Sequence, residues 1–148
     1  MRFILTVVLS LALLGCAAVV PLATPTEDAE AKAFTPHKTE ATIYVFRDDP
    51  MKGAARTLPV LIDGKMIGAS AARTFLRFNV PAGKHTLASP AGNFSAITID
   101  ARPGAIYYVR HVPRFELLLQ DISGEFEVTS ESDGKASIAK CTLAVVMY

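Results

Sequence analysis

The chain has 148 residues, of which 51% are hydrophobic and 20% are charged, and this balance excludes a wholly disordered protein. Its 15 Lys and Arg residues against 14 Asp and Glu residues leave a net charge of +1, so there is no basic excess to neutralise phosphates and we expect no nucleic-acid partner. Two cysteines exclude a disulfide-based scaffold and a four-cysteine zinc site.

The first residues have the features of an export signal. Arg2 supplies a small positive charge, and an almost unbroken apolar run follows over residues 3–14. The run has about a dozen residues, whereas a membrane-spanning helix needs about 20. It ends in Leu13-Leu14-Gly15-Cys16, which resembles the lipobox of bacterial lipoproteins. The resemblance implies cleavage before Cys16, attachment of acyl chains such as palmitate to its thiol, and acylation of the new amino group.

Two other interpretations of this segment stay open. It could be an ordinary secretory signal cleaved near Cys16-Ala17-Ala18, or the apolar start of a cytosolic chain. Under the lipoprotein interpretation, residues 1–15 are the signal peptide. Residue 17 is Ala, whereas in enterobacterial-type lipoproteins an Asp at this position favours retention in the inner membrane. The resemblance therefore implies a lipid anchor in the bacterial cell envelope, in the outer membrane and facing the periplasm.

Residues 16–40 are predicted to be the lipidated cysteine followed by a flexible linker. The segment contains Pro21, Pro25 and Pro36 among Thr, Ala and charged residues, and it shows no sustained hydrophobic period. Residues 26–33 could form a helical turn or two, because Thr26 can cap a helix that has acidic residues behind it. We therefore expect the remaining domain, residues 41–148, to be as stable without the linker.

From residue 41 onward, short apolar and β-branched runs alternate with turns that contain Pro or Gly. The runs are residues 43–46, 58–62, 66–69, 75–80, 85–88, 97–99, 105–112, 115–119 and 126–128. The turns are Asp63-Gly64-Lys65, Pro81-Ala82-Gly83-Lys84 and Arg102-Pro103-Gly104. Gly64 and Gly83 are expected to be turn glycines. Near the end, Ser132 or Asp133 can cap a short helix that extends to about residue 140, and residues 143–148 form a last strand or packed coil. The pattern predicts an all-β fold, a small antiparallel β-sandwich with a short C-terminal helix.

Four motifs in this region occur in a characteristic order. They are Tyr44-x-Phe46-Arg47, Val60-Leu61-Ile62-Asp63-Gly64-Lys65-x-x-Gly68, Phe78-x-Val80-Pro81-Ala82-Gly83-Lys84-His85-Thr86-Leu87, and Arg102-Pro103-Gly104-x-x-Tyr107-Tyr108-Val109-Arg110. Together with the lipobox, they resemble the bacterial lipoprotein family DUF2846, a domain of unknown function, and the broader PEGA-type β-sandwich modules. The resemblance covers residues 41–112 and implies a β-sandwich in the cell envelope. It brings no catalytic residues with it.

The residues that carry chemistry form no recognisable constellation in the sequence. The three histidines, His37, His85 and His111, have no metal-ligand spacing, so we expect no metal and no cofactor, and we expect His85 to be structural. If Cys16 is lipidated, Cys141 has no partner within the chain. Cys141 is then either a small buried hydrophobe or a thiol that reacts or pairs with another molecule.

One polar face suggests a ligand surface. Tyr108 and Arg110 alternate onto the same strand face, and Arg77 lies on the polar face of another strand; an aromatic ring with Arg neighbours can stack on sugars or bind anionic polymers. The alternative is that the ring covers the sheet while the Arg stems pack along it. The leading hypothesis is a non-catalytic, lipid-anchored module that contacts an envelope protein or the cell wall. The second hypothesis is a small-ligand or glycan binder that uses the strand faces or the loop of residues 48–57. We expect no enzyme activity.

Overall fold

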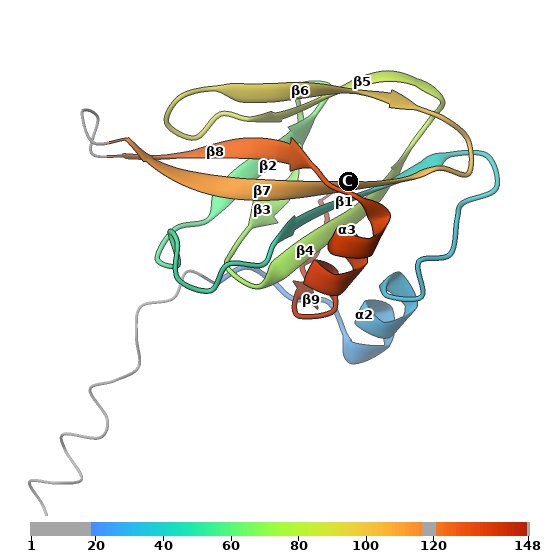
Figure 1. The fold of residues 1–148 in the computed structure, drawn as a ribbon, viewed down its shortest axis with the longest axis horizontal. Helices are drawn as coiled ribbons and strands as arrows, with labels where there is room; N and C mark the ends of the chain where they lie inside the picture. The colour runs from blue at the N-terminus through green and yellow to red at the C-terminus, as the bar shows by residue number, and fades with distance from the viewer. Residues whose placement is uncertain (1–18, 117–120, 148) are drawn as a thin grey trace, which may run out of the picture.

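A computed structural model describes residues 19–116 and 121–147. The described strands are β1 (Ala41–Arg47), β2 (Leu58–Ile62), β3 (Lys65–Ser70), β4 (Thr74–Val80), β5 (Gly83–Ser89), β6 (Ser95–Ala101), β7 (Ile106–Glu116), β8 (Asp121–Val128) and β9 (Thr142–Leu143). They form a five-stranded sheet in the order β8-β7-β1-β4-β9 and a four-stranded sheet in the order β3-β2-β5-β6. The two sheets lie in layers (Figure 1), and the predicted β-sandwich is confirmed.

The five-stranded sheet departs from the expected antiparallel arrangement at two pairs. Strand β1 is antiparallel to β4 but parallel to β7, and β4 is parallel to β9. Each parallel pair joins segments far apart in the sequence, which a pattern of short-range turns does not reveal. All seven residues of β1 are buried, because this central strand has the second sheet on one face and helices on the other.

The main core fills the space between the sheets. Alternate residues of β1 (Ala41, Ile43 and Val45) point into it and are fully buried. They meet residues of similar character from both sheets, including Val60, Leu76, Phe78, Val80, Leu87, Ile99 and Val109. This alternation places the other residues of β1 on the outer face of the five-stranded sheet.

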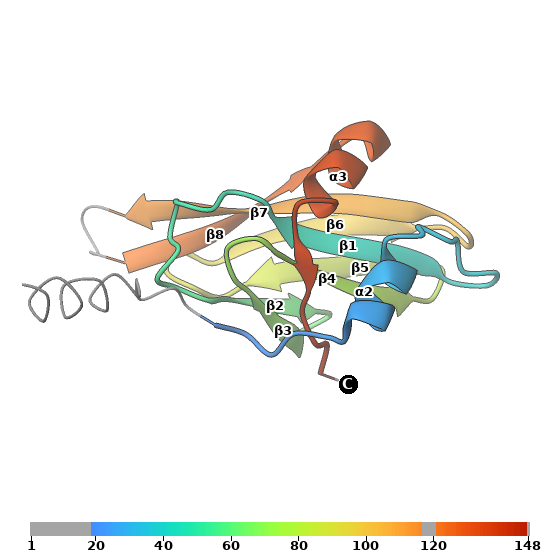
Figure 2. The same ribbon diagram turned by 90° about the horizontal axis from the view of Figure 1, so that it is seen from below.

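Two helices cover that outer face. Helix α2 (Pro25–Ala31) begins with a capping box in which Thr24 and Glu27 satisfy each other's backbone N–H groups. Helix α3 (Glu131–Ile138) is capped by Ser130, two residues before the first of the predicted caps. Both helices lie on the same side of the sheet (Figure 2), and their packing forms a second apolar cluster of Ala31, Tyr44, Phe46, Phe75, Tyr108, Ile138 and Cys141.

The described part of the predicted linker, residues 19–40, is folded onto the domain. Val20 is buried in the main core. The Ala23 N–H donates to the carbonyl of Leu143 (2.9 Å), and the Val145 N–H donates to the carbonyl of Pro21 (2.9 Å). The expectation of a flexible linker is therefore wrong from residue 19 onward. The reason is long-range pairing: this segment is polar in sequence, but the C-terminal strand supplies its hydrogen-bond partners.

The two predicted turn glycines both have positive φ, but only Gly64 lies in a turn, whereas Gly83 is the first residue of β5. Gly64 has φ +79° and Gly83 has φ +139°, conformations that favour a residue without a side chain. His85 beside them is fixed at both ring nitrogens, by the Asp63 carboxylate (2.6 Å) and the Pro81 carbonyl (2.9 Å). The hydrogen bond with Asp63 raises the pKa of His85, and this setting agrees with a structural histidine.

Within the described ranges, the helices are too short to cross a bilayer.

Candidate functional site

The predicted ligand surface of Tyr108, Arg110 and Arg77 is not an open surface. Tyr108 is only 3% exposed. Its ring stacks on Tyr44 and contacts Phe34, and a side chain on Gly134 of α3 would collide with it at 2.5 Å. Burial raises the pKa of Tyr108 to about 12, and its hydroxyl has no hydrogen-bond partner. Strand alternation in the sequence predicts the ring on the outer face of the five-stranded sheet, where it does lie, but helix α3 covers that face.

The two arginines have structural partners as well. Arg77 donates from Nε to the Tyr44 hydroxyl (3.2 Å). Arg110 pairs with Asp48, with 3.3 Å between Nε and Oδ1, and its guanidinium lies over the Phe46 ring. Because β1 runs between β4 and β7, Arg77 and Arg110 lie on opposite sides of it. The structure thus favours the alternative in which these side chains pack along the sheet.

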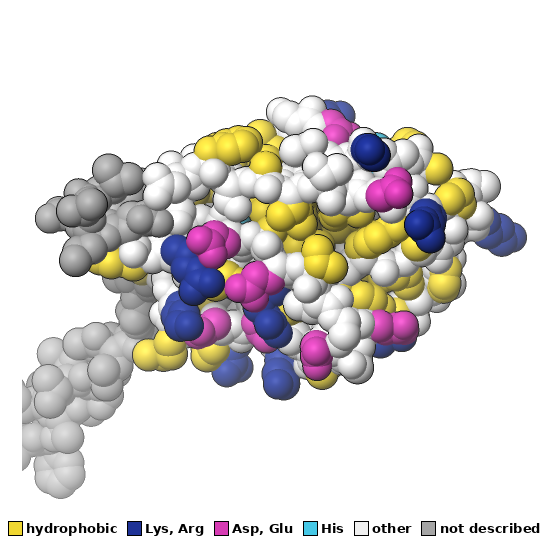
Figure 3. Space-filling model, turned by 45° about the horizontal axis from the view of Figure 1, so that its top comes forward, with side chains coloured by type: hydrophobic (Ala, Val, Ile, Leu, Met, Phe, Trp, Pro, Cys, Tyr) yellow, Lys and Arg dark blue, Asp and Glu magenta, His cyan; other side chains and the backbone are white. Residues whose placement is uncertain are grey.

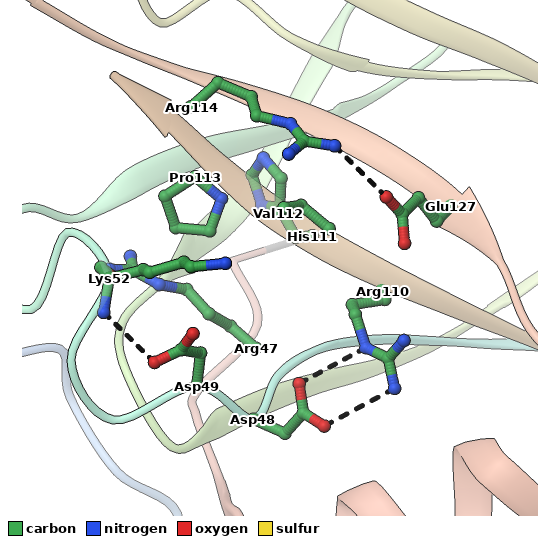
Figure 4. Close-up of a pocket in the computed structure, with 10 residues that line it drawn as sticks. All are labelled: Arg47, Asp48, Asp49, Lys52, Arg110, His111, Val112, Pro113, Arg114 and Glu127. Atoms are coloured by element: carbon green, nitrogen blue, oxygen red, sulfur yellow. Dashed lines mark hydrogen bonds and ion pairs between the residues drawn. The ribbon is translucent and has the colours of Figure 1, made fainter.

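A pocket lies where β1 and β7 pass the loop of residues 48–57, the loop that the small-ligand hypothesis named. Its volume is about 410 Å³. Figure 4 shows Arg47 and Lys52 on one side, the pair of Arg110 and Asp48 on another, and Arg114 with Glu127 across the top. The lining is completed by Asp49, His111, Val112 and Pro113. We call this site the Arg47 pocket.

Arg47 holds the pocket's loop in place. Its side chain is 1% exposed, and its guanidinium donates to the carbonyls of Arg56 (2.8 Å), Lys52 (2.9 Å) and Gly53. Neutral carbonyls stabilise a buried cation less than a carboxylate does, and burial lowers the pKa of Arg47. The sequence contained a signal for this role: Arg47 directly follows the apolar strand residues Tyr44-x-Phe46, where a buried arginine at the strand end could have been predicted.

Asp48 and Asp49, which follow Arg47, have their carboxylates bound to neighbouring parts of the fold. Asp48 accepts from the Ser137 hydroxyl (2.8 Å) in α3 as well as pairing with Arg110, which ties the helix to the strand end. Asp49 accepts from the backbone N–H groups of Met51 (2.8 Å) and Lys52 (3.0 Å), and these bonds lower the pKa of its carboxyl. The protein itself therefore orients both carboxylates.

His111 forms the floor of the pocket and is neutral. Burial lowers its pKa to about 3, and the nearby charge of Arg47 acts in the same direction. Its Nδ1 lies 2.9 Å from the Ser70 hydroxyl, its ring stacks on Phe126, and its Nε2 has no partner. A histidine with such a low pKa and no exposed surface is a poor proton shuttle near neutral pH.

The side chains that remain available for binding are basic. Lys52 is exposed, and Arg114 is about half exposed although it pairs with Glu125 (2.8 Å) and Glu127 (3.5 Å). A small anion could bind between them. In the described part of the chain, no group of three or more His, Cys, Asp and Glu residues is arranged to hold a metal ion.

The comparisons with known proteins give a family. The family described as "Protein of unknown function (DUF2846)" matches residues 37–116. The chain belongs to this family. A Haemophilus influenzae protein described as uncharacterized is 32% identical over 135 residues, which cover 90% of this chain and 79% of that protein. No solved structure matches the chain. The family assignment confirms the resemblance to DUF2846 that the four motifs carry, while the resemblance to PEGA-type modules stays a prediction. In this DUF2846 protein the match includes the two main strands of the Arg47 pocket, β1 and β7.

Proposed function

We propose that this DUF2846 protein is a non-catalytic, lipid-anchored module of the bacterial envelope, held close to the membrane and facing the periplasm. The observation that supports this proposal is the packing of the chain directly after the lipobox. Val20 is buried, and Pro21 and Ala23 are paired with the C-terminal segment. The described chain, which packs on the domain from Val20 onward, therefore begins three residues after Cys16.

This spacing has a mechanical consequence. Three extended residues reach at most about 11 Å, so a lipidated Cys16 keeps the domain at the bilayer surface. A linker of two dozen residues would instead have let the domain move several tens of ångströms away. We propose that the protein presents a binding surface at a fixed height above the membrane, to an envelope protein or to the cell wall.

The chemistry of the Arg47 pocket fits binding better than catalysis. Its carboxylates are paired with backbone N–H groups, with Arg110 or with Arg114, and its histidine is buried with a low pKa. A small anionic ligand held by Lys52 and Arg114 is the second candidate function, and it continues the small-ligand hypothesis.

The anchor is tested by fractionating cells that produce Cys16→Ser. The wild type is expected in the membrane fraction and the variant in the soluble or secreted fraction. The matched control is Cys141→Ala, which removes the other cysteine and should stay in the membrane. Membrane recovery of Cys16→Ser equal to the wild type would contradict the proposal.

The second candidate is tested by thermal unfolding with increasing inorganic phosphate. Phosphate that binds the folded protein raises its melting temperature, and Lys52→Gln should reduce this rise. Lys84→Gln, which changes an exposed lysine at the start of β5, is the control. Equal shifts in wild type and Lys52→Gln would exclude an anion site at this lysine.

A further inference from the structure

One end of the sandwich gathers four connections and the start of the described chain. The connections are the loop of residues 48–57, the β3–β4 turn, the β5–β6 loop and, of the β7–β8 hairpin, the described residues 113–116 and 121–124. We call this region the hairpin end. Figure 1 shows the ribbon beginning at the same end, on the left. Val19 lines a shallow cavity together with Ala71 and Ala72 of the β3–β4 turn, so the chain leaves toward Cys16 from here.

The hairpin end carries large apolar side chains in solvent. Met51 is 82% exposed, Phe94 is 69% exposed and Phe115 is 66% exposed. They come from three different connections. These connections touch: Gly53 lies against Pro113, and Gly92 lies against the backbone of residues 122–123. In Figure 3, hydrophobic side chains lie beside the grey segments at this end, with Lys and Arg next to them.

The β7–β8 hairpin projects beyond the rest of the molecule. Phe46 of β1 pairs with Arg110, and β1 ends one residue later, whereas β7 continues to Glu116. Arg47, the last residue of β1, is level with His111. At about 3.3 Å per residue, Phe115 stands roughly 13 Å past the end of β1. Large apolar side chains that gather in solvent are typical of a surface that another molecule covers.

We infer that the hairpin end rests on the lipid bilayer and that Phe115, Phe94 and Met51 insert into its interfacial region. This inference rests on the proposed lipid anchor. Acyl chains on Cys16, within about 11 Å of Val19, hold this end and no other against the membrane. Insertion removes the exposed rings from water at the site where a bilayer is already present.

The charges indicate which lipids are needed. Among the described side chains, Lys52, Arg56, Arg73 and Arg114 belong to this end, and so do Asp48 and Asp49. Arg114 is in turn paired with two carboxylates of β8, Glu125 and Glu127. The opposite charges balance, so apolar insertion rather than attraction to anionic headgroups holds the surface. The contact should therefore form on zwitterionic and on anionic vesicles alike.

The test uses tryptophan as a depth reporter, because the chain contains no Trp. Phe115→Trp is compared with Val128→Trp, since both native side chains are 66% exposed. Val128 pairs with Val109 and Phe115 with Ile122, so the two sites lie about 20 Å apart along the hairpin. Each lipidated full-length variant is placed in phosphatidylethanolamine and phosphatidylglycerol vesicles whose acyl chains carry bromine, which quenches nearby tryptophan. Equal unfolding temperatures verify both folds.

The expected result is loss of Trp emission at position 115 and unchanged emission at position 128. If vesicles carry the protein but neither position is quenched, the inference is wrong and the anchor proposal stands. Equal quenching at both positions would show a domain lying on its side and would also overturn it. If position 115 is shielded from aqueous iodide in unlipidated Cys16→Ser without vesicles, a protein contact covers it, and the inference fails. A wild-type protein that does not float with vesicles would contradict the anchor itself.

Discussion

Removal of a single hydroxyl group measures how strongly the N-terminal segment is bound to the domain. Tyr44 is fully buried. Its hydroxyl donates to the carbonyl of Ala31 in α2 (2.6 Å) and accepts from Arg77 (3.2 Å). Tyr44→Phe keeps the ring and its contacts with Phe34, Phe75 and Tyr108 but removes both hydrogen bonds. The substitution thus acts on the link between β1 and α2 with little change in packing.

The size of the effect follows from what the hydroxyl leaves behind. A buried hydrogen bond contributes about 1 kcal/mol, and an orphaned partner costs about 1–3 kcal/mol. Ala31 keeps only a 3.4 Å contact from the Phe34 N–H. We therefore expect Tyr44→Phe to lower the free energy of unfolding by about 1–3 kcal/mol, a fall in melting temperature of roughly 3–10 °C for a domain of this size.

The assay is urea unfolding of Tyr44→Phe in two chains, one beginning at Ala17 and one beginning at Thr39. The shorter chain lacks Ala31, so the hydroxyl has lost that acceptor already and its removal should cost about 1 kcal/mol less. Tyr107→Phe is the matched control, because the Tyr107 hydroxyl donates to the carbonyl of Asp100 (2.6 Å), outside the N-terminal segment. Equal costs of Tyr44→Phe in both chains would refute the docking of α2 through this bond.

Three further outcomes are expected. The pKa of His111, about 3 in the fold against 6.5 unfolded, means that the unfolded chain binds the proton more readily. The free energy of unfolding should therefore fall as pH decreases from about 6.5 toward 3, by up to about 1.4 kcal/mol per pH unit. Urea unfolding across this pH range should show a less steep fall in His111→Gln. Gly124→Ala should lower the free energy of unfolding by about 3 kcal/mol, because its Cβ would lie 2.1 Å from His111 Nε2. Gly64→Ala has open space but φ +79°, so it should lower this free energy by only about 1 kcal/mol. Equal losses in urea unfolding would contradict this reasoning. Burial raises the pKa of Cys141 to about 12, so a thiol reagent should label it only after unfolding, and rapid labelling of the native protein would support the reactive-thiol alternative.

The sequence by itself determined the strands and the turns. Apolar runs between Pro and Gly turns predicted the sandwich, and the four ordered motifs predicted the DUF2846 family. These features are local: Gly64 turns the chain because of its own φ, and alternation in β4 follows from its own residues. The sequence also supplied the lipobox, whose residues lie outside the described part of the chain, so lipidation remains a prediction.

Only the tertiary structure decided what covers each face. The segment predicted as a linker is ordered because Leu143 and Val145, more than a hundred residues away, hydrogen-bond to it. Tyr108 is buried because α3 brings Gly134 against its ring. The Arg47 pocket and the apolar hairpin end each combine side chains from several connections. Strand periodicity shows which residues share a face, but the partner of that face depends on contacts between distant segments, and those form only when the whole chain folds.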